Sequence, residues 1–409
     1  MLTELLALVM TRTVVRGTVH DSVEFRRLMV GGVVRVLALV VGIAITAWTL
    51  TAMVRSMLIP HGRRDLLAQF VRSVVRAVAL VPLRFMPTYR AQDLWLASMG
   101  PIGVILQLVV YAVLFIVGLG LMVYAVTDLT LGQSLYQSGS TFTTLGIVEP
   151  VNTSSTVVTF VAAFLGLIVI AVFIGYLMGT YSAYTTREAQ MARIAMIAGE
   201  PAWGPQIIVR AKMIGLPAEQ APAAASWIDW ITVTRMNTTV NIVLGDFRST
   251  SPWRHWVTTL LAVLDAAALR LALDPMKDQP ELVELLTEGA TSLRLLAMDN
   301  RSREPRIHNW SVEAEVLGVL KAGVDKDAAP PECGVTRNEF DDALRELVAV
   351  GVGMPGDLDA AWARFASVRC TYASSGEALA IRHHAVHAPW SGARKPPVPV
   401  VWPIRAGCP

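Results

Sequence analysis

Three long apolar runs interrupt the charged and polar positions in the first half of the chain. They are residues 36–54, 100–126 and 157–181. Each comes close to or exceeds the roughly 20 residues that a bilayer-spanning helix needs. No Asp, Glu, Lys or Arg lies between Asp93 and Asp128, or between Glu149 and Arg187. The pattern predicts an all-α membrane protein with one N-terminal span and a later pair of spans.

From Pro201 onward, apolar residues recur at helical spacing between polar residues, Gly and Pro. The clearest segments are 255–273, 281–298, 338–351 and 357–370. Alternating patterns typical of strands are scarce. We therefore predict a mostly helical soluble domain at 191–390. The Pro-rich residues 391–409 are expected to form an extended tail.

Residues 61–92 follow the N-terminal segment 1–60 and form a basic, amphipathic stretch. Its apolar residues recur at helical spacing, namely Leu66, Phe70, Val74 and Val78. This spacing predicts a helix at the inner membrane surface, with guanidinium groups near anionic lipid headgroups. The expected lipid-facing arginines are Arg63, Arg64, Arg72 and Arg76. A helix that only packs against the next span fits the same pattern.

The composition agrees with a chain that is partly embedded in lipid. Charged residues make up 16% of the 409 residues and hydrophobic residues 54%, whereas soluble domains carry about 25% charged residues. The net charge of +3 gives no basis for nucleic-acid binding. The three cysteines lie far apart and form no CxxC pair, which predicts neither a disulfide framework nor a zinc site.

The distribution of basic residues predicts the orientation of the spans. Residues 55–90 contain seven arginines and one acid, whereas residues 127–155 contain no Lys or Arg. Cytoplasmic loops are enriched in basic residues, so we expect the first loop and the C-terminal domain to be cytoplasmic. A full crossing by the first span then places the N-terminus outside. Because residues 1–35 carry five arginines and three acids, an incomplete first crossing stays open.

The region between the second and third spans, within the predicted module 93–190, contains a distinctive motif. Residues 133–142 predict a short helix, and residues 143–149 read TTLGIVE. This arrangement resembles the two-span pore-loop module of the potassium-channel superfamily, whose filter reads Thr-x-Gly-(Tyr/Phe)-Gly-Asp. The matching positions are Thr144, Gly146 and the acid Glu149. The aromatic residue and the second glycine are replaced by Ile147 and Val148.

The replacement of the second glycine has a physical consequence for a filter. Filter carbonyls replace the water around the ion, and aligning them needs left-handed backbone that glycine adopts without strain. A β-branched residue such as Val148 would be strained there. We therefore expect a short or widened filter with weak selectivity. Its ion-pathway residues would be Thr143, Thr144, Leu145, Gly146, Ile147 and Val148.

Two further positions bear on a pore. Glu149 either concentrates cations at an outer mouth or caps the start of the third span. Within that span, the resemblance implies that a glycine such as Gly166 or Gly175 acts as a gating hinge of the inner helix. Close helix packing through small residues is the alternative interpretation of each glycine.

One pore loop per chain can surround an axis only by repetition, so we expect a homotetramer. The leading interpretation is a tetrameric cation channel of the bacterial inner membrane, with weakened or lost potassium selectivity, that passes K⁺ or Na⁺. The alternative is a non-conducting sensor or scaffold whose cytoplasmic domain binds a partner. The sequence contains no catalytic motif, so we expect neither an enzyme nor a bound cofactor, and it identifies no ligand of the domain.

The second half of the chain resembles a further group of proteins. The segments are 199–205 (GEPAWGP), 247–269 and 387–397. They are similar to bacterial membrane proteins that are assigned to ion channels by their pore region. The resemblance implies a shared helical cytoplasmic domain, and it supplies no ligand and no activity.

Two polar features of the domain raise the question of a chemical site. His383 and His387 have the i, i+4 spacing of a helical metal pair, but no further ligand pattern completes it, so we expect a surface cluster and no metal. Asp265 lies within an apolar helical pattern. We expect it to pair with an arginine such as Arg248 rather than to act in catalysis.

Overall fold

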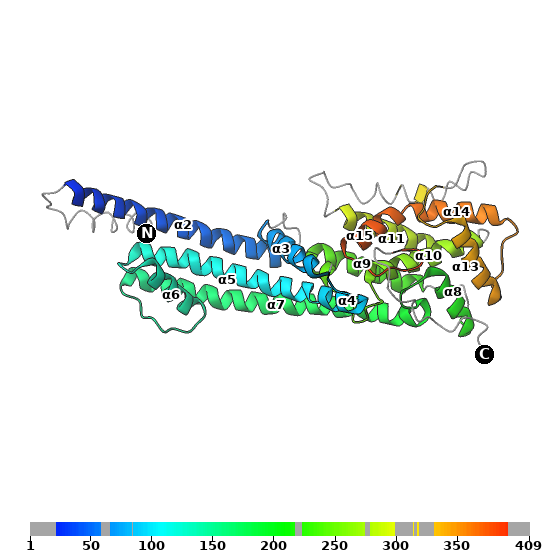
Figure 1. The fold of residues 1–409 in the computed structure, drawn as a ribbon, viewed down its shortest axis with the longest axis horizontal. Helices are drawn as coiled ribbons and strands as arrows, with labels where there is room; N and C mark the ends of the chain where they lie inside the picture. Colours follow the sequence, from blue (N-terminus) through cyan, green and yellow to red (C-terminus); the bar gives the residue numbers. More distant parts are fainter. Residues whose placement is uncertain are drawn as a thin grey trace. The chain divides into compact units, whose positions relative to one another are not determined.

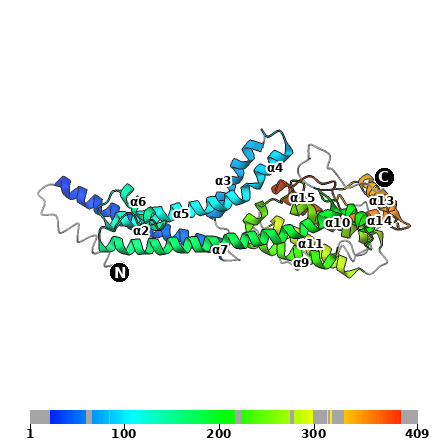
Figure 2. The same cartoon turned by 90° about the horizontal axis from the view of Figure 1, so that it is seen from below.

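The chain is all-α over the part that the computed structural model describes (Figures 1 and 2). The described residues are 22–58, 66–83, 85–216, 223–274, 279–298, 314, 317–318 and 331–391. They fall into two compact units: a first unit made of residues 1–75 and 102–179, and a second made of 76–101 and 180–409. Apart from Ser391, the predicted tail lies outside the described residues.

Among the described residues, four segments are long and apolar enough to cross a membrane. They are Val30–Met57, Arg90–Val126, Thr153–Ala198 and Trp256–Leu273. The first three contain the three predicted spans and belong wholly or largely to the first unit, which we call the membrane unit. In the fourth segment, 83% of the residues are buried. It therefore forms a core helix of the second unit. The prediction of an all-α membrane protein with several spans is confirmed.

In the membrane unit, α2 (Ser22–Met57) runs antiparallel to α5 (Met99–Val126). Near one end, Arg35 NH2 lies 2.9 Å from Asp128 Oδ1. Near the other end, Gln107 Nε2 donates to Ser56 Oγ at 2.8 Å. Because these contacts lie at both ends of α5, α2 follows α5 over its length. If α5 crosses the bilayer, α2 crosses it too, which disfavours the incomplete first span.

Small residues allow α2 and α5 to approach each other closely. A Cβ atom on Gly42 would lie 2.6 Å from the carbonyl oxygen of Gly118, and one on Gly118 would lie 2.5 Å from Thr46 Oγ1. No side chain larger than hydrogen fits at either position without a backbone shift. Spans in lipid associate through such packing rather than through the hydrophobic effect, so these two glycines fix the first span against the second.

The third span lies in α7 (Thr153–Ala198), a single helix of 46 residues that belongs to both units. Figure 1 shows α2, α5 and α7 side by side, with α6 (Leu131–Phe142) at one end of α5 and α7. Phe115 of α5 and Phe142 of α6 stack with ring centroids 5.7 Å apart. The short helix predicted at 133–142 is therefore present as α6 and is held between the two spans.

The second unit is a bundle around α10 (Trp256–Leu273), which is buried along almost its whole length. The predicted helices at 255–273, 281–298, 338–351 and 357–370 are confirmed as α10, α11 (Pro280–Met298), α13 (Arg337–Ala349) and α14 (Leu358–Cys370). Sequence reasoning did not single out α8 (Gly204–Met213), α9 (Ala224–Val240), the 3₁₀ helix η2 (Ile242–Asp246) and α15 (Ala373–Arg382). The mostly helical second half agrees with the prediction.

A buried ion pair joins α10 to α14. Arg369 Nε donates to Asp265 Oδ1 at 2.9 Å, and the Tyr372 hydroxyl donates to the same oxygen at 2.7 Å. Arg369 also donates to the carbonyls of Cys333 and Trp390. Asp265 therefore pairs with an arginine as expected, but the arginine is Arg369 and not Arg248, which pairs with Asp93. Arg369 lies in the last turn of α14, where its guanidinium is buried inside the bundle next to Asp265.

We predict that Arg369→Met lowers the free energy of unfolding by about 3–5 kcal/mol, because it leaves the Asp265 carboxylate buried without its countercharge. Denaturant unfolding of the detergent-solubilised chain measures this. Arg337→Gln is the control, because its partner Asp359 is 91% exposed and surface pairs contribute about 0–1 kcal/mol. Equal losses in both variants would show that the buried pair has no special weight.

Candidate functional site

The candidate site is the hairpin formed by α6 and residues 143–151, between α5 and α7. Its helix starts at a capping box. Thr130 Oγ1 accepts the Gln133 amide at 3.4 Å, and Gln133 Oε1 accepts the Thr130 amide at 3.0 Å. This reciprocal pair satisfies two amides that the first turn leaves without partners. The sequence therefore sets the point at which the chain turns into α6.

α6 packs on the spans through small and polar side chains. Ser138 Oγ donates to the Ile116 carbonyl of α5 at 2.9 Å. A Cβ atom on Gly120 of α5 would lie 2.7 Å from Leu135 Cδ2. Gln137 is fully buried, and its Nε2 lies 3.4 Å from Thr159 Oγ1 of α7. Polar groups that are buried in this way need protein partners in a bilayer, so α6 is seated in the membrane unit.

The end of α6 touches α7 at Gly166. A Cβ atom there would lie 2.1 Å from the carbonyl oxygen of Phe142, closer than any side chain can come. At Gly175, by contrast, a Cβ atom would meet nothing within 4 Å. This geometry favours the packing interpretation for Gly166. It leaves Gly175 as the candidate hinge, on an exposed part of α7.

α6 ends in a Schellman motif. The Leu145 amide donates to the Ser140 carbonyl at 2.8 Å, and the Thr144 amide donates to the Thr141 carbonyl at 2.9 Å. This motif requires a left-handed residue at the position of Thr144, where glycine is usual. Thr144 has φ +63°. A β-branched residue in this region costs about 1–3 kcal/mol.

The segment after Thr144 directs its amides back toward α6. Gly146 donates to the Ser140 carbonyl at 3.3 Å, and Ile147 donates to Ser140 Oγ at 2.9 Å. Gly146 also has φ +63°, so the left-handed residues Thr144 and Gly146 lie on either side of Leu145, which does not have a positive φ. Within the described part of the chain, the carbonyls of residues 144–147 accept no hydrogen bond. Ser140 thus accepts the hydrogen bonds of these backbone amides, whereas the carbonyls of residues 144–147 are available to other donors or to ions.

The filter-like residues lie close together and are accessible in one chain. Thr143, Thr144, Leu145, Gly146 and Ile147 are exposed, although the Thr143 hydroxyl donates to the Gly139 carbonyl of its own helix at 2.8 Å. The left-handed backbone lies at residues 144 and 146. Val148 has no positive φ, in line with the expectation that a β-branched residue does not extend the left-handed backbone there; the left-handed threonine at residue 144 was not expected.

Glu149 is exposed and does not cap the third span. The cap is Asn152, whose Oδ1 accepts the Ser155 amide at 2.8 Å. The Asn152 Nδ2 group also donates to the Val126 carbonyl at the end of α5, at 2.8 Å. Because Asn152 makes the tether that was one interpretation of Glu149, the Glu149 carboxylate is left at the loop surface.

The arginines expected at lipid headgroups have different positions. Arg63 and Arg64 lie outside the described residues. Arg72 and Arg76 lie on α3 (Leu66–Leu83) and are partly buried. Arg76 NH2 lies 3.0 Å from Asp246 Oδ1. Its guanidinium is thus engaged within the protein.

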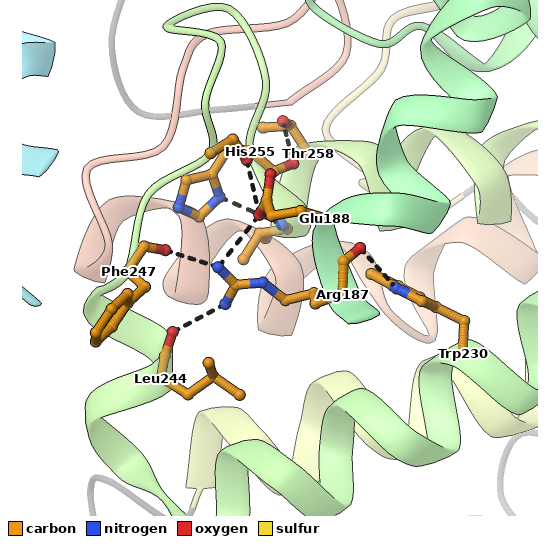
Figure 3. A network of polar contacts seen from close by, with 9 residues as sticks. Arg187, Glu188, Trp230, Leu244, Phe247, His255 and Thr258 are labelled. Carbon is orange, nitrogen blue, oxygen red and sulfur yellow. Dashed lines mark hydrogen bonds and ion pairs between the residues drawn. The ribbon is translucent and has the colours of Figure 1, made fainter. Parts of the chain in front are cut away.

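A second polar constellation lies in the second unit at residues 241–255, which we call the clamp segment. The buried side chain of Arg187, on α7, donates from NH1 to the Leu244 carbonyl at 2.9 Å and from NH2 to the Phe247 carbonyl at 2.8 Å (Figure 3). Glu188 Oε1 is 3.4 Å from NH2. A buried charge is costly unless it is compensated, so these contacts fix α7 to the clamp segment.

Two more elements reach the clamp segment by ion pairs. Besides the Arg76–Asp246 pair from α3, Arg248 Nε donates at 2.8 Å to Asp93 Oδ1 of α4 (Tyr89–Ala97). Arg248 NH1 also donates to the His383 carbonyl, just after α15, at 3.2 Å. The clamp segment therefore holds together the parts of α3, α4 and α7 that lie in the second unit.

Sequence reasoning missed the clamp segment. The available signal was that Asp93 and Arg187 are the charges that bound the apolar runs of the second and third spans. A charge in such a place commonly marks a membrane boundary, and its partner cannot be read from sequence. Arg248 is 155 residues from Asp93, so only the fold pairs them.

The histidine pair does not form a helical metal site. α15 ends at Arg382, so His383 and His387 lie beyond it. The i, i+4 spacing therefore places them on no common helical face. In the ranges that the structure describes, no group of three or more His, Cys, Asp or Glu residues is placed to hold a metal ion.

The chain matches no known protein family, no curated protein and no solved structure. The hairpin and the clamp segment are therefore the features of the chain that bear on its function. The likeness to potassium-channel pore loops remains a resemblance, carried by residues 143–149 and their position between two spans.

We predict that Gly166→Ala destabilises the membrane unit, because the new methyl group would overlap the Phe142 carbonyl. Gly175→Ala should raise helix stability by up to about 1 kcal/mol, since Ala is the better helix former and nothing lies near its Cβ. The apparent melting temperature of each variant in detergent measures the effect. If both variants melt together, the contact between α6 and α7 is not a constraint.

Proposed function

We propose that the chain forms a homotetrameric cation channel of the bacterial inner membrane, with little preference between K⁺ and Na⁺. The supporting observation is the hairpin's row of backbone carbonyls at residues 144–147, which accept no hydrogen bond within the described residues. Irregular backbone at membrane depth is tolerated only where protein buries it or where it lines water. Four copies around one axis meet this condition and create a wet path.

The strained threonine supports a role in that path. Glycine would take the conformation of Thr144 without strain, yet the chain carries an exposed Thr there. Strained residues cluster at functional sites. In the proposed tetramer, the Thr144 hydroxyl and the carbonyls that follow contact the permeant ion. No cofactor is required, because dehydration of the ion is the only chemistry.

Weak selectivity follows from the short length of this segment. Only residues 144 and 146 have left-handed backbone in the hairpin, so the alternation that aligns carbonyls covers about one site. Selectivity among monovalent cations needs several carbonyl rings of fixed geometry. Four copies of Glu149 at the outer mouth would concentrate cations without distinguishing them.

The arginine-rich loop predicts that the second unit is cytoplasmic. In this proposal, that unit regulates the channel. α7 extends without a break from the Gly166 contact in the membrane unit to Arg187, which donates to the Leu244 carbonyl of the clamp segment. A helix transmits rotation and tilt along its axis. In this proposal, changes in the clamp segment open or close the path through α7, with Gly175 as a point of bending.

A non-conducting sensor or scaffold is the second candidate. It is favoured by the two large apolar side chains of the loop, Leu145 and Ile147, which are 66% and 63% exposed in one chain. If they point to the axis rather than toward a neighbouring copy, they block it. The clamp segment would then be the functional part of the protein.

Ion flux from liposomes that contain the purified protein tests the channel. We expect K⁺ and Na⁺ to pass at similar rates and N-methylglucamine to be excluded. Glu149→Gln should lower the flux at low salt, and the loss should shrink at high salt because salt screens exposed carboxylates. Glu149→Asp keeps the charge and is the control. A tetramer that gives no flux above protein-free liposomes would favour the scaffold.

Thr144→Gly tests the strained position. We expect it to raise the free energy of unfolding by about 1 kcal/mol, because glycine adopts the left-handed conformation without strain, and to change the ratio of K⁺ to Na⁺ flux. Thr143→Gly is the matched control, since φ −83° at Thr143 needs no glycine and the change should destabilise. A more stable Thr144 variant with unchanged ion ratios would place its hydroxyl outside the path.

A further inference from the structure

The part of α3 and α4 that belongs to the second unit forms a helical hairpin, visible in Figure 2. Trp95 Nε1 of α4 donates to the Ala79 carbonyl of α3 at 2.8 Å. Thr88 caps α4 by accepting the Ala91 amide at 3.3 Å. These bonds define one compact element, the α3–α4 hairpin, at residues 76–101.

One face of the α3–α4 hairpin is polar and held within the protein. Arg76 pairs with Asp246, and the buried Asp93 pairs with Arg248. The opposite face presents large apolar side chains. The exposed fractions are 62% for Val78, 61% for Val81, 82% for Phe85 and 66% for Leu94. We call these four residues the outer face.

The outer face reverses the arrangement of an ordinary helix in water, where large apolar residues are buried and charges are exposed. On α3, Val75 and Ala79 are buried, whereas Val78 and Val81 are exposed. Clusters of exposed apolar side chains on a protein surface mark contacts with membranes or with other proteins. The outer face therefore needs a partner.

Two observations identify that partner as lipid. α4 leads through Ser98 directly into α5, and Arg90–Val126 qualifies as one apolar, membrane-crossing stretch. The α3–α4 hairpin is thus attached to the end of a span. Residues 76–101 also contain three arginines and one acid, and of these Arg76 and Asp93 are paired within the protein. The two remaining arginines would repel those of a second copy, whereas anionic headgroups would be attracted to them.

We infer that the outer face of the α3–α4 hairpin inserts into the boundary between headgroups and acyl chains of the bilayer. The lipid contact is made by Val78, Val81, Phe85 and Leu94, while Arg76 points to the clamp segment. The α3–α4 hairpin is therefore a membrane-docking element of the second unit. This inference is independent of whether the pore conducts, so the failure of one leaves the other standing.

Site-directed spin labelling tests the inference on the full chain in liposomes that contain phosphatidylglycerol. The native cysteines are first replaced by Cys333→Ala, Cys370→Ser and Cys408→Ser. Labels are placed by Val78→Cys and Phe85→Cys. The matched control is Val348→Cys, on α13, because Val348 is 55% exposed in the same unit but lies outside the outer face. The measurement is label accessibility to oxygen and to a water-soluble nickel chelate.

Insertion predicts that the labels at 78 and 85 are accessible to oxygen and protected from nickel, whereas the label at 348 shows the reverse. Labels at 78 and 85 that match the control would overturn the inference. Spectral broadening that disappears on dilution with unlabelled chains would also overturn it, because it would assign the outer face to a second copy.

A second arm uses liposomes of phosphatidylcholine alone. Persistent protection from nickel at 78 and 85 supports insertion by the apolar side chains. Protection that is lost without anionic lipid would overturn the assignment to the outer face and attribute membrane binding to the arginines instead.

Discussion

Backbone amides that leave a helix need other hydrogen-bond acceptors, and this constraint shapes the hairpin between α5 and α7. Ser140 provides two such acceptors, its carbonyl and its hydroxyl. Its carbonyl accepts the amides of Leu145 and Gly146, and its hydroxyl accepts the amide of Ile147. One residue at the helix end thereby satisfies three donors of an irregular segment. The carbonyls of that segment accept no hydrogen bond within the described residues.

The packing of the membrane unit serves to hold this helix end in place. α6 presents Ser138 and the buried Gln137 to its neighbours, together with Phe142, which stacks on Phe115. Gly166 lets the backbone of α7 reach the Phe142 carbonyl. Close packing through small residues is the usual source of stability between spans. α6 is therefore part of the packing between α5 and α7 rather than a loop on their surface.

The sequence by itself determined the type and approximate limits of many elements. Apolar length located the three spans, and helical periodicity located α10, α11, α13 and α14. The short stretch 133–142 between two apolar runs and the Thr-Gly pair that follows it also located α6 and the turn at residues 143–146. These features depend on residues within a few positions of each other, which is why a linear reading can find them.

Only the tertiary structure decided how distant charges pair and where backbone strain falls. Asp265 binds Arg369, and Asp93 binds Arg248, across 104 and 155 residues. The left-handed strain lies at Thr144 because the end of α6 sets the turn. It was also the fold that turned Arg76 inward and Phe85 outward on one helical hairpin. Periodicity shows that a helix has two faces, but only its contacts decide which face is buried.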